Sequence, residues 1–263
     1  MTTTLAIVSD THSGSTVGLC PPRVTLDDGG DYHPSREQRR MWGWWLEYWQ
    51  EVGRHPGEKV VIFLGDMVEG DSKQRSTQVV TRNKADLLKL AAATLEPAYQ
   101  VATRCYFVRG TGAHVGKSAS LEEQLANDCE LAVKTEGGNA SWWRLSGTID
   151  GVNILAQHHA PGPGRQPWTK LNPLLQHAFK LSLVTPRIAL SVAAHNHRHA
   201  DTMDAYPTRH IALPCWQGQT EYSYRLGTME PPDIGGIIVT LDRGKYTVDT
   251  LPFTAPRQTL KEL

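Results

Sequence analysis

The sequence predicts an α/β protein in which two packed β-sheets form a two-sheet sandwich flanked by helices (αββα). In the first half of the 263-residue chain, apolar runs of strand length alternate with helical patterns. The second half is richer in adjacent strand-like segments, which favours two sheets over a single doubly wound sheet. No repeat, low-complexity tract or obvious linker interrupts the chain, so we expect one domain covering residues 1–263.

The first half contains three predicted strands and two predicted helices. Residues 4–9 form an apolar first strand, and a long polar loop follows it. Ser35 is a suitable N-cap for a helix that runs to about Gly53. Residues 59–65 are almost continuously apolar, as expected for a strand covered on both faces. An apolar stripe over 81–99 predicts the second helix, and residues 104–108 predict the third strand.

The second half begins with a predicted helix over residues 121–134. Residues 142–149 and 152–157 then predict a hairpin around Asp150-Gly151, a preferred two-residue turn. A further helix over 170–183 ends before Pro186, and a strand over 188–194 follows. The last predicted strands lie near residues 208–213, 235–241 and 246–251.

Composition excludes several classes of protein. Hydrophobic residues make up 40% and charged residues 21% of the chain, which is ordinary globular usage. The formal net charge of zero gives no overall attraction to nucleic acid or to an anionic membrane. We expect no membrane span and no signal peptide, because the apolar runs are too short. The four cysteines include no CxxC pair, which argues against a thiolate zinc site and suits a reducing, cytoplasmic location.

Aspartate and histidine residues follow five of the predicted strands. They are Asp10 and His12, Asp66, His114, His158 and His159, and His195 and His197. Strand ends are where an α/β protein builds its site. Carboxylate and imidazole groups together suit Mn, Fe, Zn or Ni. The pattern therefore predicts a metal-dependent hydrolase.

Spacing indicates how these side chains could share metal ions. Asp10 and His12 are two residues apart, so in an extended segment both would point to the same side, and His195 and His197 repeat this spacing. Gly65, immediately before Asp66, would let the backbone approach a metal closely. A carboxylate can bridge two ions ~3.5–4 Å apart, and such a pair can bind phosphate and generate hydroxide at neutral pH.

The motifs D-x-H, G-D-x-x-x-G, a Gly/His segment after the third strand, an isolated His and H-x-H occur here in that order. This order resembles the calcineurin-like metallophosphoesterase family, and the resemblance extends over residues 10–197. Each motif is weak alone, whereas the ordered set is specific. The resemblance implies a sandwich fold, a metal-dependent phosphoesterase and two divalent metal ions, with Mn or Fe expected first and Zn or Ni as alternatives.

The resemblance also implies roles for individual residues. The first metal would be bound by Asp10, His12, Asp66 and His197, and the second by Asp66, His158 and His195. His158 is preferred to His159 because it comes first after the strand. His114 is the implied catalytic residue, donating a proton to the leaving alkoxide. The substrate would be a phosphomonoester or phosphodiester, with nucleotides and nucleic acids among the candidates.

One segment departs from the family pattern. The family has Gly-Asn-His-Asp/Glu, with the Asn as a metal ligand, whereas residues 110–114 read Gly-Thr-Gly-Ala-His. Thr111 replaces the Asn when the segments are aligned from the strand end, and Ala113 replaces it when they are aligned from the histidine. Water, Thr111 or His114 itself could then complete the second metal. The missing Asn favours a non-catalytic metal-binding scaffold as one alternative function, and a DNA or RNA nuclease of the same fold is another.

Three further sets of residues receive a role beside the site. Glu69 could support the metal ligands from behind, but a solvated loop residue is the preferred expectation. His199 is expected to be a rim or structural residue. The loop over 160–168 follows His158 directly, so Arg165 and Trp168 are candidates to touch substrate.

Overall fold

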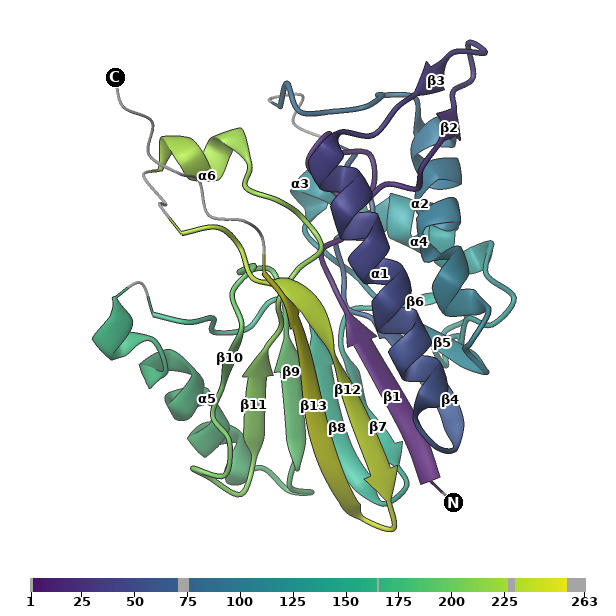
Figure 1. Ribbon diagram of the computed structural model, residues 1–263. Helices are drawn as coiled ribbons and strands as arrows, with labels where there is room; N and C mark the ends of the chain where they lie inside the picture. The colour runs from purple at the N-terminus through teal and green to yellow at the C-terminus, as the bar shows by residue number, and fades with distance from the viewer. Residues whose placement is uncertain (1, 71–75, 165, 227–229, 255–263) are drawn as a thin grey trace.

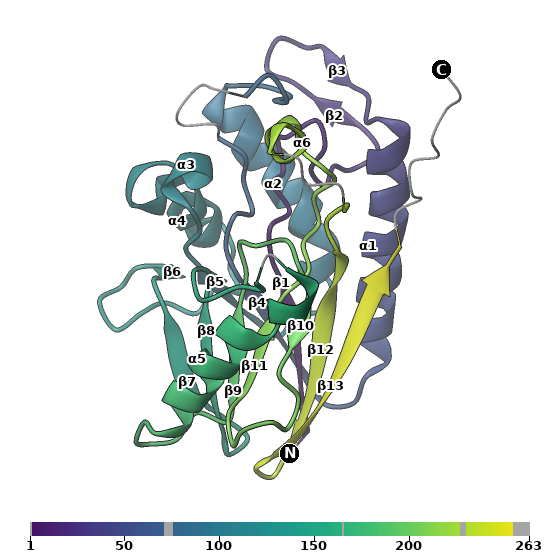
Figure 2. The same ribbon diagram turned by 90° about the vertical axis from the view of Figure 1, so that its left-hand side faces the viewer.

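Two β-sheets pack face to face and carry helices on their outer faces (Figure 1). This computed structural model describes residues 2–70, 76–164, 166–226 and 230–254. Three helices cover one sheet: α1 (Arg36–Arg54), α2 (Lys84–Tyr99) and α4 (Ser120–Asn127). On the other side α5 (Asn172–Ser182) lies across the second sheet, as Figure 2 shows. The predicted helix-flanked sandwich is therefore confirmed.

The first sheet has six strands in the order β13-β12-β1-β4-β5-β6. Its strands are β1 (Thr2–Val8), β4 (Glu58–Phe63), β5 (Arg104–Val108), β6 (Ser141–Trp142), β12 (Ile234–Asp242) and β13 (Lys245–Phe253). β1, β4, β5 and β6 are mutually parallel, whereas β12 and β13 form an antiparallel edge. The parallel strands therefore all deliver their carboxyl ends to the same edge of the sandwich.

The second sheet has five strands in the order β10-β11-β9-β8-β7. Its strands are β7 (Leu145–Ile149), β8 (Val152–Gln157), β9 (Leu190–Ala193), β10 (Ala200–Asp201) and β11 (Arg209–Ala212). β8, β9 and β11 are parallel, and β7 and β10 are the antiparallel edges. A small ribbon of β2 (Val24–Thr25) and β3 (Asp31–Tyr32) lies in the long loop after β1.

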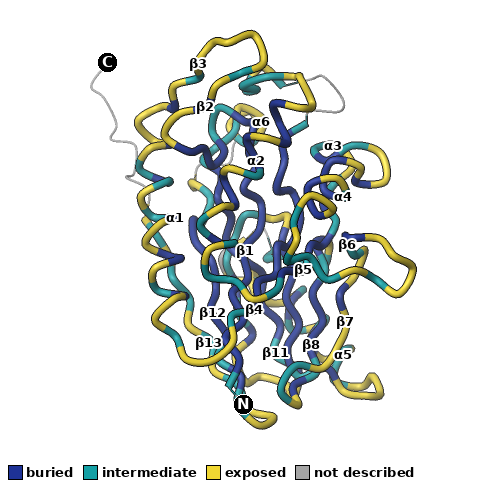
Figure 3. The backbone as a smooth tube through the Cα atoms, turned by 90° about the vertical axis from the view of Figure 1, so that its right-hand side faces the viewer, coloured by how far each residue is buried: buried dark blue, intermediate teal, exposed yellow. Residues whose placement is uncertain are grey.

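Two hydrophobic cores hold these layers together. Between the sheets, Ile7 and Ile62 of the first sheet belong to the same buried cluster as Ile154 and Val192 of the second. Alternate residues of β1 and β4 face the helices instead, where Trp45, Tyr48 and Trp49 of α1 are buried. Strands with both faces covered need apolar residues at every position, which explains the unbroken apolar runs of the sequence. Figure 3 shows most of β1 and β4 buried inside the sandwich; only the first residue of β1 and the first two of β4 are less buried.

Two predicted elements were wrong in extent. The helix expected over 121–134 ends at Asn127, because the chain turns back to the sheet: the Cys105 N–H donates to the Leu131 carbonyl at 2.8 Å. The strand expected over 142–149 is divided, since β6 pairs with β5 and β7 pairs with β8 in the other sheet. Both differences come from pairing with distant segments. In the described part of the chain, no helix is both long and apolar enough to span a membrane.

Candidate metal centre

The predicted ligands lie in turns beyond the strands, and their backbones are unusual. Five of them adopt positive φ angles: Asp10 (54°), His12 (43°), Asp66 (55°), His195 (74°) and His197 (53°). This conformation costs a non-glycine residue roughly 1–2 kcal/mol, and such strain concentrates at functional sites. β1 ends at Val8 and β9 at Ala193, so the extended geometry expected for the two His-containing pairs was wrong. The side chains converge because the chain turns sharply at each ligand.

Backbone hydrogen bonds between the loops after β1 and β4 hold these turns. The Asp10 N–H donates to the Gly65 carbonyl at 2.9 Å, and the His12 N–H donates to the Asp66 carbonyl at 3.0 Å. The Trp216 N–H donates to the Asp10 carbonyl at 3.1 Å. The first and second motifs are therefore fixed to each other by the backbone before any side chain interacts.

The first group of candidate ligands contains Asp10, His12 and His197, whose donor atoms all lie within 4.8 Å of one another. His197 Nε2 is 3.2 Å from Asp10 Oδ1 and 3.3 Å from His12 Nε2. Asp10 and His12 are almost completely buried, with 0% and 1% of their surfaces exposed. Imidazole nitrogens and a carboxylate oxygen thus converge where water has little access.

A second group joins Asp10 to Asp66 and His158. His158 Nε2 is 3.0 Å from Asp66 Oδ2 and 4.0 Å from Asp10 Oδ1. His158 Nδ1–H donates to the Leu64 carbonyl at 2.7 Å, which directs Nε2 and its lone pair toward the carboxylates. Asp10 is therefore the carboxylate common to the first two groups, a position that the resemblance gives to Asp66.

A third group consists of His158, His159 and His195, so the structure places both of the alternative histidines beside His195. Thr111 lies next to them. Its hydroxyl oxygen is 3.4 Å from His158 Nε2 and 3.2 Å from His195 Nδ1. Its N–H donates to Asp66 Oδ1 at 2.7 Å. Thr111, one of the two candidates for the position of the missing Asn, therefore contacts all three histidines.

Glu69 is buried against two histidines of the cluster. It is only 6% exposed, and its carboxylate contacts His12 Nδ1 at 3.0 Å and His114 Nδ1 at 2.8 Å. The expectation of a solvated loop residue was wrong because the loop folds inward: Glu69 N–H donates to the Ser13 carbonyl. Burial alone would raise the pKa of Glu69, but the hydrogen bonds from His114 and His12 lower it to about 2. The signal available in the sequence was its place inside the G-D-x-x-x-G motif.

Carboxylates and imidazoles in the cluster shift one another's pKa values. Burial lowers the pKa of His12, but hydrogen bonds to the Asp10 and Glu69 carboxylates outweigh it and bring the pKa to about 10. Burial also lowers the pKa of His158, but the charges of Asp66 and Asp10 outweigh it and raise the pKa to about 9. Against its own burial, Asp10 has a pKa well below the ordinary value because His197 and His158 are close. Ionised carboxylates among imidazoles are a donor set that fits a divalent metal ion.

Two glycines make room for the ligands. A Cβ at Gly65, which has φ +88°, would lie 2.5 Å from His158 Nδ1. A Cβ at Gly110 would lie 2.2 Å from Asp66 Oδ1. Larger residues at these positions would displace the candidate ligands. Gly65 is therefore needed both for the positive φ angle of the turn and for the space that His158 occupies.

Glu122 was also missed as a residue of the site's framework. It is 1% exposed, and its carboxylate accepts hydrogen bonds from the N–H groups of Met67 and Gly110. It therefore ties together the loops after β4 and β5, which carry Asp66 and Thr111. Burial is the largest cause that raises the pKa of Glu122 to about 7, and the Asp66 charge adds to it. Its place in a first helical turn gave no sign of this role.

The predicted catalytic residue His114 lies on the short helix α3 (Gly112–Val115), with its ring centroid 4.6 Å from that of His12. Its side chain is 33% exposed, so it borders solvent and the buried candidate ligands.

The other residues expected beside the site can be placed only in part. Trp168 is 79% exposed, and Arg165 lies outside the described residues. The His199 Nδ1–H donates to the Ala212 carbonyl at 3.1 Å, which is consistent with a structural role.

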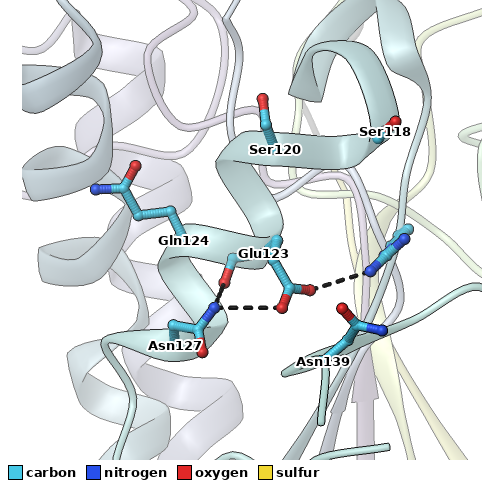
Figure 4. Close-up of a pocket in the computed structure, with 7 residues that line it drawn as sticks. Ser118, Ser120, Glu123, Gln124, Asn127 and Asn139 are labelled. Atoms are coloured by element: carbon cyan, nitrogen blue, oxygen red, sulfur yellow. Dashed lines mark hydrogen bonds and ion pairs between the residues drawn. The ribbon is translucent and has the colours of Figure 1, made fainter. Parts of the chain in front are cut away.

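A pocket of about 480 Å³ lies along α4 (Figure 4). Its lining residues are Arg109, Ser118, Ser120, Glu123, Gln124, Asn127 and Asn139. Glu123 accepts hydrogen bonds from Arg109 at 3.2 Å and from Asn127 at 3.2 Å. The charge of Arg109 is thereby balanced within the chain, and the predicted ligands lie outside this lining.

No protein family model matches the sequence, and a search of curated proteins finds no relative. Solved structures do match. A single-residue variant of Vps29 from Entamoeba histolytica is 11% identical, with 95% of this chain and 99% of that chain covered and a TM-score of 0.42. A dimetal phosphatase from Danio rerio is 11% identical, covering 94% and 95% at a TM-score of 0.47. A 5'-nucleotidase precursor from Thermus thermophilus is 12% identical at a TM-score of 0.45; 96% of this chain aligns with 54% of that one. Resemblances this distant leave the reaction to be inferred from the side chains.

Proposed function

We propose that this protein is a metal-dependent phosphoester hydrolase that uses two divalent metal ions. The observation that carries the proposal is the convergence of two carboxylates and several imidazoles from separate strand ends, held by strained turns. Oxygen and imidazole ligands suit Mn, Fe, Zn and Ni alike. We expect Mn or Fe first, as the family resemblance implies, with Zn or Ni as alternatives. The free cysteines suit a reducing, cytoplasmic setting.

The ligands divide between two neighbouring positions. We assign one ion to Asp10, His12, Asp66 and His197, and the other to Asp66, His158 and His195. Asp10 and Asp66 both have an oxygen within 4.8 Å of a His158 nitrogen, so either carboxylate could be shared by the two positions. Two bound ions would polarise the phosphoryl group and lower the pKa of an attacking water.

His114 is the proposed proton donor to the leaving oxygen. Its Nδ1 contacts Glu69, so Nε2, on the other side of the ring, points away from that carboxylate. The Glu69 carboxylate fixes the orientation of the His114 ring. A proton held at Nε2 can then pass to the leaving alkoxide. Glu69 also contacts His12, which couples the proton donor to the ligand set.

Substrates of either phosphoester type suit this arrangement. The formal net charge of zero disfavours strong nonspecific binding to nucleic acid. We therefore propose a small phosphomonoester or phosphodiester, with nucleotides included, before a nuclease. The replacement of the family's Asn by Thr111 favours one further candidate function, a metal-binding scaffold without activity.

A substrate panel with metal analysis tests the proposal. The metal-free protein is reloaded with Mn, Fe, Zn or Ni and given p-nitrophenyl phosphate, bis-p-nitrophenyl phosphate, single-stranded DNA and duplex DNA. We expect turnover of a nitrophenyl ester that Asp66→Asn abolishes and that His33→Ala, a change at an exposed histidine outside the cluster, leaves intact. Bound metal without turnover of any substrate would identify a scaffold, and turnover of DNA alone a nuclease.

A further inference from the structure

The two ends of the ligand cluster differ in their chemistry. The end formed by Asp10, His12 and His197 includes a buried carboxylate. The other end consists of three imidazoles that meet edge to face. The ring centroid of His158 lies 4.8 Å from that of His159 and 5.3 Å from that of His195, and the latter two lie 4.5 Å apart. Donor atoms of these three rings all lie within 4.8 Å of one another.

His159 turns into this group although it follows His158 directly. Consecutive residues of a strand point to opposite faces, but β8 ends at Gln157, before both histidines. His159 Nε2 is 3.5 Å from the Thr111 hydroxyl oxygen, which is also the neighbour of His158 and His195. One oxygen and three ring nitrogens therefore converge on a small volume at the rim of the cluster, where His159 and His195 are exposed.

Thr111 explains why an additional ligand is needed there. Its N–H is held by Asp66, so the residue is fixed in place. Its hydroxyl is a weaker neutral ligand than the amide oxygen of the family's Asn, and its side chain is shorter. An ion at this end would therefore be short of a ligand unless another side chain supplied one. His159 is a neighbouring side chain, with its Nε2 3.5 Å from the Thr111 hydroxyl oxygen.

We propose that His159 is a ligand of the second metal ion, which makes this position a three-histidine site selective for zinc-like ions over Mn. This inference rests on the proposed two-metal centre. Three imidazoles and an oxygen are a ligand set typical of zinc, and nitrogen-rich sites follow the order in which Zn binds more tightly than Mn. The first position, which has two carboxylates where the second shares only Asp66, remains suited to Mn or Fe.

Metal binding to the metal-free, full-length protein tests this without any assay of activity. We expect wild type and His33→Ala to bind two equivalents of Zn, and His159→Ala to retain one while losing affinity for the second by ~10–100-fold or more. His159→Cys, which keeps a zinc ligand, should restore the second equivalent. With Co as the probe, the loss of the His159 ligand should change the visible absorption that appears when the second equivalent is added.

Two outcomes would overturn the inference. One is a His159→Ala protein that binds the second Zn with wild-type affinity. The other is a second position that prefers Mn to Zn when both are supplied to the wild type. If wild type bound no metal, the proposed function would fail together with this inference, whereas two bound ions without hydrolysis would refute only the proposed activity.

Discussion

Replacing Gly65 with alanine should disturb both the turn after β4 and the ring of His158. Gly65 has φ +88°, and an added Cβ would lie 2.5 Å from Nδ1 and 2.8 Å from Cγ of His158. It would also lie 2.9 Å from the Cα of Gly110, so the backbone behind it cannot give way easily. We expect the His158 ring to be pushed from its position, which breaks the 2.7 Å hydrogen bond to the Leu64 carbonyl.

The expected loss of stability is the sum of two effects. The left-handed backbone conformation costs an alanine roughly 1–2 kcal/mol relative to glycine. Leaving the buried Leu64 carbonyl without its donor costs a further ~1–3 kcal/mol. Together these lower the free energy of unfolding by ~2–5 kcal/mol, which a typical domain survives. The displaced ligand should also weaken metal binding.

Urea unfolding of the metal-free protein, followed by circular dichroism, measures the first effect, and metal analysis after desalting measures the second. Gly43→Ala is a matched control, because Gly43 lies in α1 with open space around its Cβ position. It should gain ~0.5–1 kcal/mol from the better helix propensity of alanine. A Gly65→Ala protein within ~0.5 kcal/mol of wild type, with unchanged metal content, would refute the role given to Gly65.

Further predictions concern protons and catalysis. The folded-state pKa of Glu122, about 7, lies above its ordinary 4.5, so the stability that its protonated form contributes is present below pH 4.5 and lost as pH rises through 7. Relative to Glu122→Gln, wild type should lose up to ~3 kcal/mol across this window in urea unfolding; parallel curves would contradict it. Because the pKa values of His12 and His158 are about 10 and about 9, metal binding at pH 7.5 should release protons and tighten as pH rises toward 9. Calorimetry in buffers of different ionisation enthalpy measures that release, and buffer-independent heats would argue against it. His114→Asn should lower kcat by ~10²–10⁴-fold while both ions stay bound; loss of an ion would instead make His114 a ligand.

The fold was predictable where local pattern and burial agree. Continuous apolar runs correctly predicted β1 and β4, and the capping pattern at Ser35 correctly predicted the start of α1. The helix expected over 121–134 was too long because its last turn competes with backbone pairing to Cys105, a partner far away in the sequence. Such tertiary pairing leaves no local signal.

The sequence predicted that these residues lie close together, but not the geometry that brings them together. Asp10, Asp66, His158, His195 and the other predicted ligands do come together, since parallel strands end at the same edge. The left-handed turns that aim them depend on hydrogen bonds between loops, which spacing does not reveal. Glu69 was misread for the same reason: its burial arises from contacts with two histidines on other segments.

The central claim is that two metal ions in this cluster hydrolyse a phosphoester. Stepwise addition of Mn and Zn to the metal-free protein, with bound metal and hydrolysis of bis-p-nitrophenyl phosphate and p-nitrophenyl phosphate followed together, tests it most directly. We predict that hydrolysis rises with the second bound equivalent, reaches a plateau there, and is absent from Asp66→Asn. Two tightly bound equivalents without hydrolysis of either ester at any loading would contradict the claim.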